Sequence, residues 1–218
     1  MKNEKIVCDR KKIIDSLSPK SKERYKKIIQ AATEVFLEQG YSSANMSEIV
    51  KRAGGSLTTL YKIFDNKATL FTEVIRDESD KIFCIFLQNS KCNGKDTIED
   101  ILYTLAKAFV KAIAEEKTIY FYRIMIHEGY KNDSELGKQF LKEVDHTTDL
   151  VANYIEKMIC KDELNVDNLK IASFQFLHLI CEPTFTYLVF GLNHLVSDEL
   201  IEKSIRQAVR IFLNGIKQ

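Results

Sequence analysis

Apolar side chains recur every three or four residues along most of this chain, which is the periodicity of amphipathic helices. They form one stripe between residues 20 and 39, and Gly40 follows where such a helix ends. No alternating run rich in valine and threonine, which would indicate a strand, interrupts the pattern. The chain is therefore predicted to be all-α. Further long helices are predicted over residues 67–86, 96–116, 118–130, 134–161, 167–190 and 197–217.

Two short helices are predicted between the first long helix and the one that begins at Lys67. One covers about Met46–Ala53 and starts with Asn45, which precedes a carboxylate by three positions and resembles a capping box. Gly54 follows it at the place of a left-handed C-terminal cap. The other is a helix of barely two turns after Ser56, whose hydroxyl can accept from the first backbone N–H groups. Three helices with a glycine turn between the second and third form a helix-turn-helix head.

The second short helix has one apolar face and one polar face. Leu60 and Phe64 lie four residues apart and can anchor it in a core, which leaves hydroxyl groups and a cation on the outside. Such a helix fits the DNA major groove, where threonine, leucine and lysine can reach base edges. Tyr61 and Lys67 are predicted to contact phosphate. The complete set of predicted DNA contacts is Asn45, Ser56, Leu57, Thr58, Thr59, Tyr61, Lys62 and Lys67.

The segment from Ala31 to Leu70 resembles the DNA-binding domain of the TetR (tetracycline repressor-like) family of bacterial transcription regulators. Four positions depart from the family pattern, namely Val50, Gly55, Leu57 and Thr58, so the operator sequence does not carry over. The residues that carry the resemblance, in the family's order and spacing, are Ala31-Ala32, Phe36, Gly40-Tyr41, Ile49, Ala53-Gly54, Ser56, Thr59-Leu60-Tyr61, Phe64, Lys67 and Leu70.

The resemblance implies a homodimer that binds palindromic, double-stranded operator DNA and represses transcription. It also implies that a small apolar or amphipathic effector binds the C-terminal body and releases the DNA. Three short segments are similar to the multidrug-efflux repressors of the family, which implies control of an efflux system. These segments are Gly54-Gly55-Ser56-Leu57, Glu182-Pro183 and Phe212-Leu213-Asn214-Gly215-Ile216.

Charge is distributed unevenly along the chain. Residues 1–67 contain 14 Lys or Arg and 8 Asp or Glu, whereas residues 68–218 contain 18 and 23. A basic head on an acidic body favours a polyanion at one end of the molecule. The predicted domains are a basic N-terminal arm (1–17), a helix-turn-helix DNA-binding domain (18–66), a linking helix (67–90) and a ligand-binding and dimerisation domain (91–218). The arm has two open interpretations, a minor-groove contact and a solvated tail.

The segment Ile171–Gly191 contains almost no charged side chain, and Glu182 is its lone carboxylate. A helix that is apolar all round must be covered all round, and a second copy of the chain is the simplest cover. We therefore predict a homodimer through the last two helices, which form a four-helix bundle across a two-fold axis.

Aromatic side chains and methionine in the body suit an adaptable apolar ligand pocket. The alternative is that the same side chains fill a core, and the family resemblance is what favours a cavity. The candidate ligand-binding residues, expected to face inward together, are Leu105, Phe109, Tyr122, Met125, Phe140, Phe174, His178 and Cys181.

Neither a cofactor nor a metal is predicted. His178, Cys181 and Glu182 are ligand types, but the adjacent pair splays apart and makes a poor coordination set. No phosphate-binding loop, nucleophile elbow or HExxH motif is present, so an enzyme is not predicted. The sequence shows no signal peptide and no apolar run of eighteen residues, so no association with a membrane is predicted. The five cysteines include no CxxC pair and are predicted to be reduced thiols of a cytoplasmic protein. The alternative function is a regulator of the same fold without an inducer, either constitutive or thiol-sensing through Cys160 or Cys181.

Overall fold

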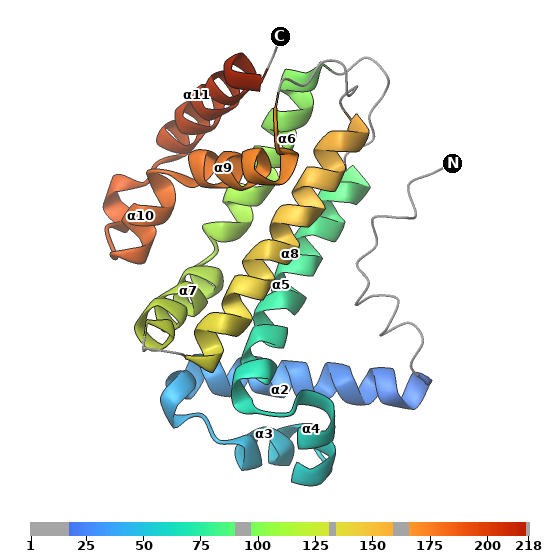
Figure 1. The fold of residues 1–218 in the computed structure, drawn as a ribbon. Helices are drawn as coiled ribbons and strands as arrows, with labels where there is room; N and C mark the ends of the chain where they lie inside the picture. Colours follow the sequence, from blue (N-terminus) through green and yellow to red (C-terminus); the bar gives the residue numbers. More distant parts are fainter. Residues whose placement is uncertain (1–17, 90–96, 131–133, 159–165, 217–218) are drawn as a thin grey trace. The chain divides into compact units, whose positions relative to one another are not determined.

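The computed structural model describes residues 18–89, 97–130, 134–158 and 166–216. These residues form helices and no strand, so the all-α prediction is confirmed for them (Figure 1). The helices are α2 (Pro19–Ser43), α3 (Met46–Ala53), α4 (Leu57–Phe64), α5 (Lys67–Asn89), α6 (Ile98–Ile113), α7 (Glu116–Gly129), α8 (Glu135–Met158), α9 (Leu169–Cys181), α10 (Thr184–Val189), the short 3₁₀ helix η3 (Asn193–Leu195) and α11 (Asp198–Ile216).

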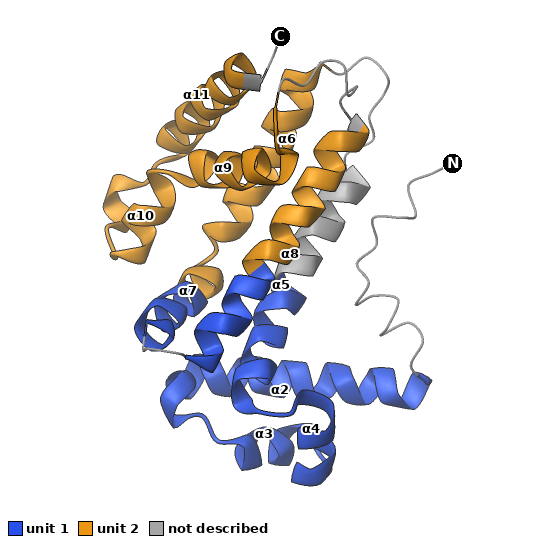
Figure 2. Ribbon diagram, in the orientation of Figure 1, with its two compact units in different colours: residues 1–80, 120–143 blue, residues 81–119, 144–218 orange. Residues whose placement is uncertain are grey.

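The chain divides into two compact units (Figure 2). The first comprises residues 1–80 and 120–143, and the second comprises residues 81–119 and 144–218. Helices α5, α7 and α8 each contribute residues to both units. The four-part division expected from the sequence remains a prediction, and its N-terminal arm lies outside the described residues.

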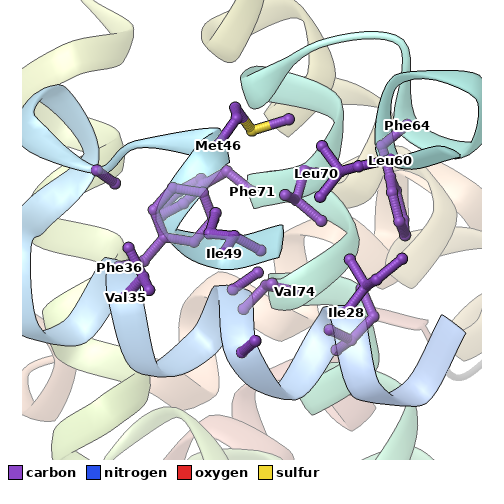
Figure 3. Close-up of a cluster of buried hydrophobic side chains, with 14 of the residues drawn as sticks. Ile28, Val35, Phe36, Met46, Ile49, Leu60, Phe64, Leu70, Phe71 and Val74 are labelled. Carbon is purple, nitrogen blue, oxygen red and sulfur yellow. The ribbon is translucent and has the colours of Figure 1, made fainter. Parts of the chain in front are cut away.

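The core of the first unit is built mainly from α2, α3, α4 and the first half of α5 (Figure 3), and α7 and α8 also contribute buried side chains to it. Leu60 and Phe64, which the sequence pattern assigns to the interior, are fully buried, and so is Ile49 of α3. Phe71 of α5 packs edge-on against Phe36, with ring centroids 4.9 Å apart, and packs in the same way against Phe121 of α7 at 5.6 Å. The core of the helix-turn-helix head is therefore continuous with residues from the middle of the chain.

Local hydrogen bonds fix the beginnings of the short helices. Asn45 Oδ1 accepts from the Ser47 backbone N–H at 2.8 Å, which caps α3 as expected. Ser56 Oγ accepts from the Thr59 backbone N–H at 3.2 Å, which caps α4. The capping box resemblance holds only in part, because the Glu48 carboxylate instead accepts from Arg52 Nε at 3.0 Å.

Helices α6, α9 and α11 form the core of the second unit. Phe176 of α9 and Phe212 of α11 pack with ring centroids 4.6 Å apart. The single helix predicted over residues 167–190 is wrong, since α9 ends at Cys181 and α10 begins at Thr184. Pro183 has no N–H to donate and disfavours helical backbone in the residue before it, and Glu182 accordingly has an extended backbone.

Candidate DNA-binding site

Helix α4 presents most of its surface to solvent. Leu57 is 38% exposed and Tyr61 is 45% exposed, and Thr58, Thr59 and Lys62 also lie in the exposed class. Leu60 and Phe64 attach the opposite face to the core (Figure 3). The outward surface therefore carries two hydroxyl groups, a phenol, an ammonium group and aliphatic carbon, as the sequence predicts.

One further apolar side chain of α4 lies outside the core. Ile63 is 41% exposed, although it was not among the predicted DNA contacts. Its position next to Phe64 and three residues after Leu60 places it beside the buried stripe, not within it. Helical spacing therefore places Ile63 at the edge of the buried face, and its exposure is established by the structure.

The predicted caps Asn45 and Ser56 lie at the N-termini of α3 and α4, and both side chains are used by the backbone. Ser56 Oγ also lies 3.0 Å from Thr59 Oγ1. These hydroxyl and amide groups shape the ends of the two helices whether or not they touch DNA, so their DNA contacts remain predictions.

The side chain of Lys67, for which a phosphate contact is predicted, lies against backbone carbonyl groups of its own chain. Its ammonium group donates to the backbone carbonyl oxygens of Tyr41 at 2.8 Å, Ser42 at 3.1 Å and Ala44 at 3.2 Å. Burial lowers the pKa of Lys67, and the charge of Glu128 on α7 opposes that shift. The ammonium group thus donates to the last residues of α2 and to Ala44, which follows them. The phosphate contact remains a prediction.

A second cation, the guanidinium group of Arg52, connects two helices at the surface of the head. Both terminal nitrogens of Arg52, in the last turn of α3, donate to the Glu38 carboxylate at 2.7 Å. This hydrogen bond is the main reason that the pKa of Glu38 is lowered. The bidentate geometry fixes α3 against α2 and therefore contributes to the placement of the turn that leads into α4.

Two sequence-family profiles match the chain. The family described as "Bacterial regulatory proteins, tetR family" matches residues 28–74, and the one described as "AefR-like transcriptional repressor, C-terminal domain" matches residues 100–215. The second match alone spans more than half of the chain. The chain belongs to the TetR family. Regulators of the TetR family bind operator DNA and function as dimers.

The individual relatives described next are at most 27% identical to this chain over the matched residues. The HTH-type transcriptional activator FasR of Mycolicibacterium smegmatis is 27% identical over 135 residues, which cover 62% of this chain and 60% of FasR. The chain thus matches less than two thirds of the length of that curated relative. A putative TetR-family regulator from Mesorhizobium loti has a similar fold, with a TM-score of 0.73 and 22% identity over 93% of this chain and 100% of that one. The flavonoid-responsive regulator FrrA also has a similar fold, with a TM-score of 0.67. It is 27% identical to this chain, and the match covers 89% of this chain and 97% of FrrA.

The predicted ligand-binding residues are divided between the two units. Tyr122, Met125 and Phe140 belong to the first unit, where the rings of Tyr122 and Phe140 pack edge-on at 5.8 Å. Leu105, Phe109 and Cys181 are buried or half-buried in the second unit.

Two more of these residues lie on the exposed face of α9. The rings of Phe174 and His178 pack in a tilted arrangement with centroids 4.2 Å apart, and His178 Nδ1 lies 2.8 Å from the Phe174 carbonyl oxygen. Both side chains are exposed, so the inward orientation expected for them is wrong for the single chain. Their role in ligand binding remains a prediction.

Cys181 is a buried thiol in the last position of α9. Burial, with a smaller effect from the charge of Glu182, raises its pKa to about 12. Because the thiolate is the reactive form, this environment disfavours thiol sensing through Cys181. Cys160, the other proposed sensor residue, lies outside the described residues.

We expect Cys181 in the native protein at pH 8 to react with iodoacetamide at least about tenfold more slowly than in urea, where the thiol is exposed and its pKa is ordinary. Mass spectrometry of the peptide that contains Cys181, at timed intervals, measures both rates. Equal rates in the two states would show that the thiol is accessible and reactive in the native protein.

The described helices include none that is both long and apolar enough to cross a membrane. The same part of the chain contains no group of three or more His, Cys, Asp or Glu side chains arranged to hold a metal ion. The pair His178 and Cys181 illustrates why, since the first side chain is exposed and the second is buried.

Proposed function

We propose that this chain is a homodimeric, ligand-responsive repressor, in which the α4 helices of two copies enter successive major grooves of a palindromic operator. The observation that carries the proposal is the division of α4 into a buried anchor and an exposed polar surface. Leu60 and Phe64 hold the helix in the core, while Thr58, Thr59 and Lys62 remain available to a partner.

Each exposed side chain of α4 has a contact that suits its chemistry. The hydroxyl groups of Thr58 and Thr59 can donate or accept at base edges, and their methyl groups and Leu57 can touch thymine methyl groups. Lys62 can donate to guanine or to a phosphate, and the Tyr61 hydroxyl can donate to a phosphate. Affinity from such cationic contacts is expected to fall steeply as salt rises.

The proposed dimer interface lies on the last helices of the body. Large apolar side chains are exposed there in the single chain, and Phe190 just after α10 is 76% exposed. Ile171 on α9 and Ile211 on α11 are also about half exposed. The exposure of these side chains supports the proposed dimer, because a second copy that covered them would remove large apolar groups from water.

The proposed effector is a small apolar or amphipathic molecule that binds the C-terminal body. The likeness to FrrA, which its title describes as flavonoid-responsive, supports this assignment. The profile match to the C-terminal domain of AefR-like transcriptional repressors supports the repressor role. The effector releases DNA only to the extent that it binds the DNA-incompetent conformation more tightly. A coupling free energy of about 1–3 kcal/mol would weaken operator binding about 5- to 150-fold.

Control of an efflux system is the proposed biological output. The support for it is the sequence similarity of the Gly54–Leu57 segment and the Glu182-Pro183 step to multidrug-efflux repressors. Footprinting on DNA beside the protein's own gene, with and without apolar cations and bile-type amphiphiles, tests operator binding and release together. Operator binding that no tested compound changes would favour a constitutive regulator of the same fold.

Replacing Lys62 by alanine is expected to weaken operator binding about tenfold, because one good base or phosphate contact is worth about 1–3 kcal/mol. Fluorescence anisotropy with the footprinted duplex measures the change. Lys111→Ala is the matched control, since Lys111 is an exposed lysine on α6, outside the head. Unchanged affinity of both Lys62→Ala and Tyr61→Phe would rule out the proposed DNA-reading surface.

A further inference from the structure

The guanidinium group of Arg24, on α2, lies against the glycine turn between α3 and α4. Its Nη1 donates to the Ala53 carbonyl oxygen at 3.1 Å. A Cβ atom placed on Gly55 would lie 2.0 Å from Nη2 and 2.4 Å from Cζ of Arg24. Arg24 Nη2 is buried and has no hydrogen-bond partner among the described residues. The guanidinium is therefore held by one hydrogen bond and by packing on the bare Cα of Gly55.

This turn sets the direction in which α4 leaves α3. Gly54 has φ 74° and Gly55 has φ 106°, a left-handed pair of conformations that glycine adopts without strain. Ser56 then returns to extended backbone and caps α4. Ala53 is the last residue of α3, so its carbonyl group lies at the negative end of that helix, where a cation is favourable. Arg24 thus connects α2 to the junction between the two short helices.

Helix α4 is short enough for its first turn to control its whole orientation. It has eight residues, and it is anchored to the core by Leu60 and Phe64. Hydrogen bonds to base edges require well-defined distances and angles, so a small rotation of the helix affects them strongly. A lysine on a flexible stem that faces a phosphate tolerates the same rotation.

We propose that Arg24 is a positioning residue for DNA sequence discrimination, matched to glycine at position 55, and that it acts through the α3–α4 turn without contacting DNA. The inference rests on the proposed reading of bases by α4. It assigns a role to the departure of Gly55 from the family pattern, because a side chain at position 55 would occupy the space that the Arg24 guanidinium fills.

The test uses the full-length protein, a duplex that the parent selects from a random library and a shuffled duplex of the same composition. Arg24→Ala is expected to weaken binding to the selected duplex about tenfold, which corresponds to about 1.4 kcal/mol, and to leave binding to the shuffled duplex unchanged. Arg24→Lys, which can still donate to the Ala53 carbonyl, is expected to recover part of the loss. Thermal unfolding establishes that each variant is folded at the assay temperature.

Salt dependence separates positioning from direct phosphate contact. Arg24→Ala is expected to keep the parent's slope of log affinity against log salt, whereas loss of one phosphate contact would reduce its magnitude by about 0.9. A reduced slope, or an equal loss of affinity for both duplexes, would overturn the positioning role.

A double-mutant cycle tests the match between Arg24 and Gly55. Alanine at position 55 is strained at φ 106° in either background, so that cost cancels in the cycle. Gly55→Ala is expected to weaken binding to the selected duplex by a larger factor in the parent than in Arg24→Ala, because only the parent has a guanidinium to displace. Equal factors would overturn the match. A parent that does not prefer its selected duplex would overturn the proposed base reading and this inference with it.

Discussion

Replacing Arg76 by alanine is expected to lower the free energy of unfolding by about 3–5 kcal/mol, the usual cost of removing one partner from a buried ion pair. Arg76 Nε donates to Glu143 Oε2 at 2.5 Å, and Glu143 is only 4% exposed. Arg76 Nη1 also donates to Glu73 Oε1 at 3.2 Å. The variant leaves the buried Glu143 carboxylate without this cation, and water cannot readily replace it there.

Urea unfolding followed by circular dichroism measures this change. Arg76→Ala combined with Glu143→Gln is expected to recover part of the loss, because the buried group is then neutral. Arg206→Ala is the control, since Arg206 pairs with Glu202 on the exposed surface of α11, where such a pair contributes about 0–1 kcal/mol. A stability of Arg76→Ala within 1 kcal/mol of the parent, or no recovery in the double variant, would contradict the explanation.

The contacts around Arg76 show which part of the structure depends on long-range information. Tyr25 Oη donates to Glu73 Oε2 at 2.7 Å, so one polar chain runs from α2 through α5 to α8. The sequence assigns Tyr25 to an apolar stripe, which its buried ring confirms. The pattern gives no sign of the partner of its hydroxyl group, because residues 25, 73 and 143 become neighbours only in the folded chain.

The DNA-binding head is the part that sequence reasoning predicts best. The caps at Asn45 and Ser56, the turn at Gly54 and the anchors Leu60 and Phe64 all follow from residues a few positions apart. Each feature is decided by local hydrogen bonds, by backbone conformation or by helical spacing. Local information therefore suffices to define which surface of α4 faces outward.

The body is less predictable because helical spacing defines a face but does not identify what covers that face. Phe174 and Phe176 are both aromatic residues of α9, yet the first is exposed and the second is fully buried against Phe212. The break at Pro183 had a visible local cause, but the apolar character on both sides of it favoured one continuous helix. Which apolar residues enclose a ligand depends on contacts between distant segments.

Lys67 has hydrogen-bond partners within the chain that the local argument did not identify. The N-terminus of a helix favours anions, which suggested a phosphate beside the first residue of α5. A cation in that position is itself unfavourable with respect to the dipole of its own helix. The ammonium group instead donates to the carbonyls of Tyr41, Ser42 and Ala44 and lies 4.7 Å from the centroid of the Tyr41 ring.

Lys67→Met is therefore expected to lower the free energy of unfolding by about 2 kcal/mol, because three carbonyl oxygens lose a charged donor and water replaces it only in part. Urea unfolding measures the loss. Lys51→Met, on the exposed surface of α3, is the control and is expected to change stability by less than about 0.5 kcal/mol. A Lys67→Met variant as stable as this control would show that the three hydrogen bonds contribute little.

DNA binding distinguishes this structural role from the phosphate contact predicted from the sequence. If Lys67 only supports the link between α2 and α3, Lys67→Met retains the parent's dependence of operator affinity on salt. If the ammonium group instead leaves the carbonyls and reaches a phosphate in the complex, the magnitude of the salt slope falls by about 0.9. Glu128, whose carboxylate accepts from Ser42 Oγ, offers an independent check. Glu128→Gln removes a charge near Lys67 without removing its carbonyl acceptors, so the variant is expected to retain most of the stability that Lys67→Met loses.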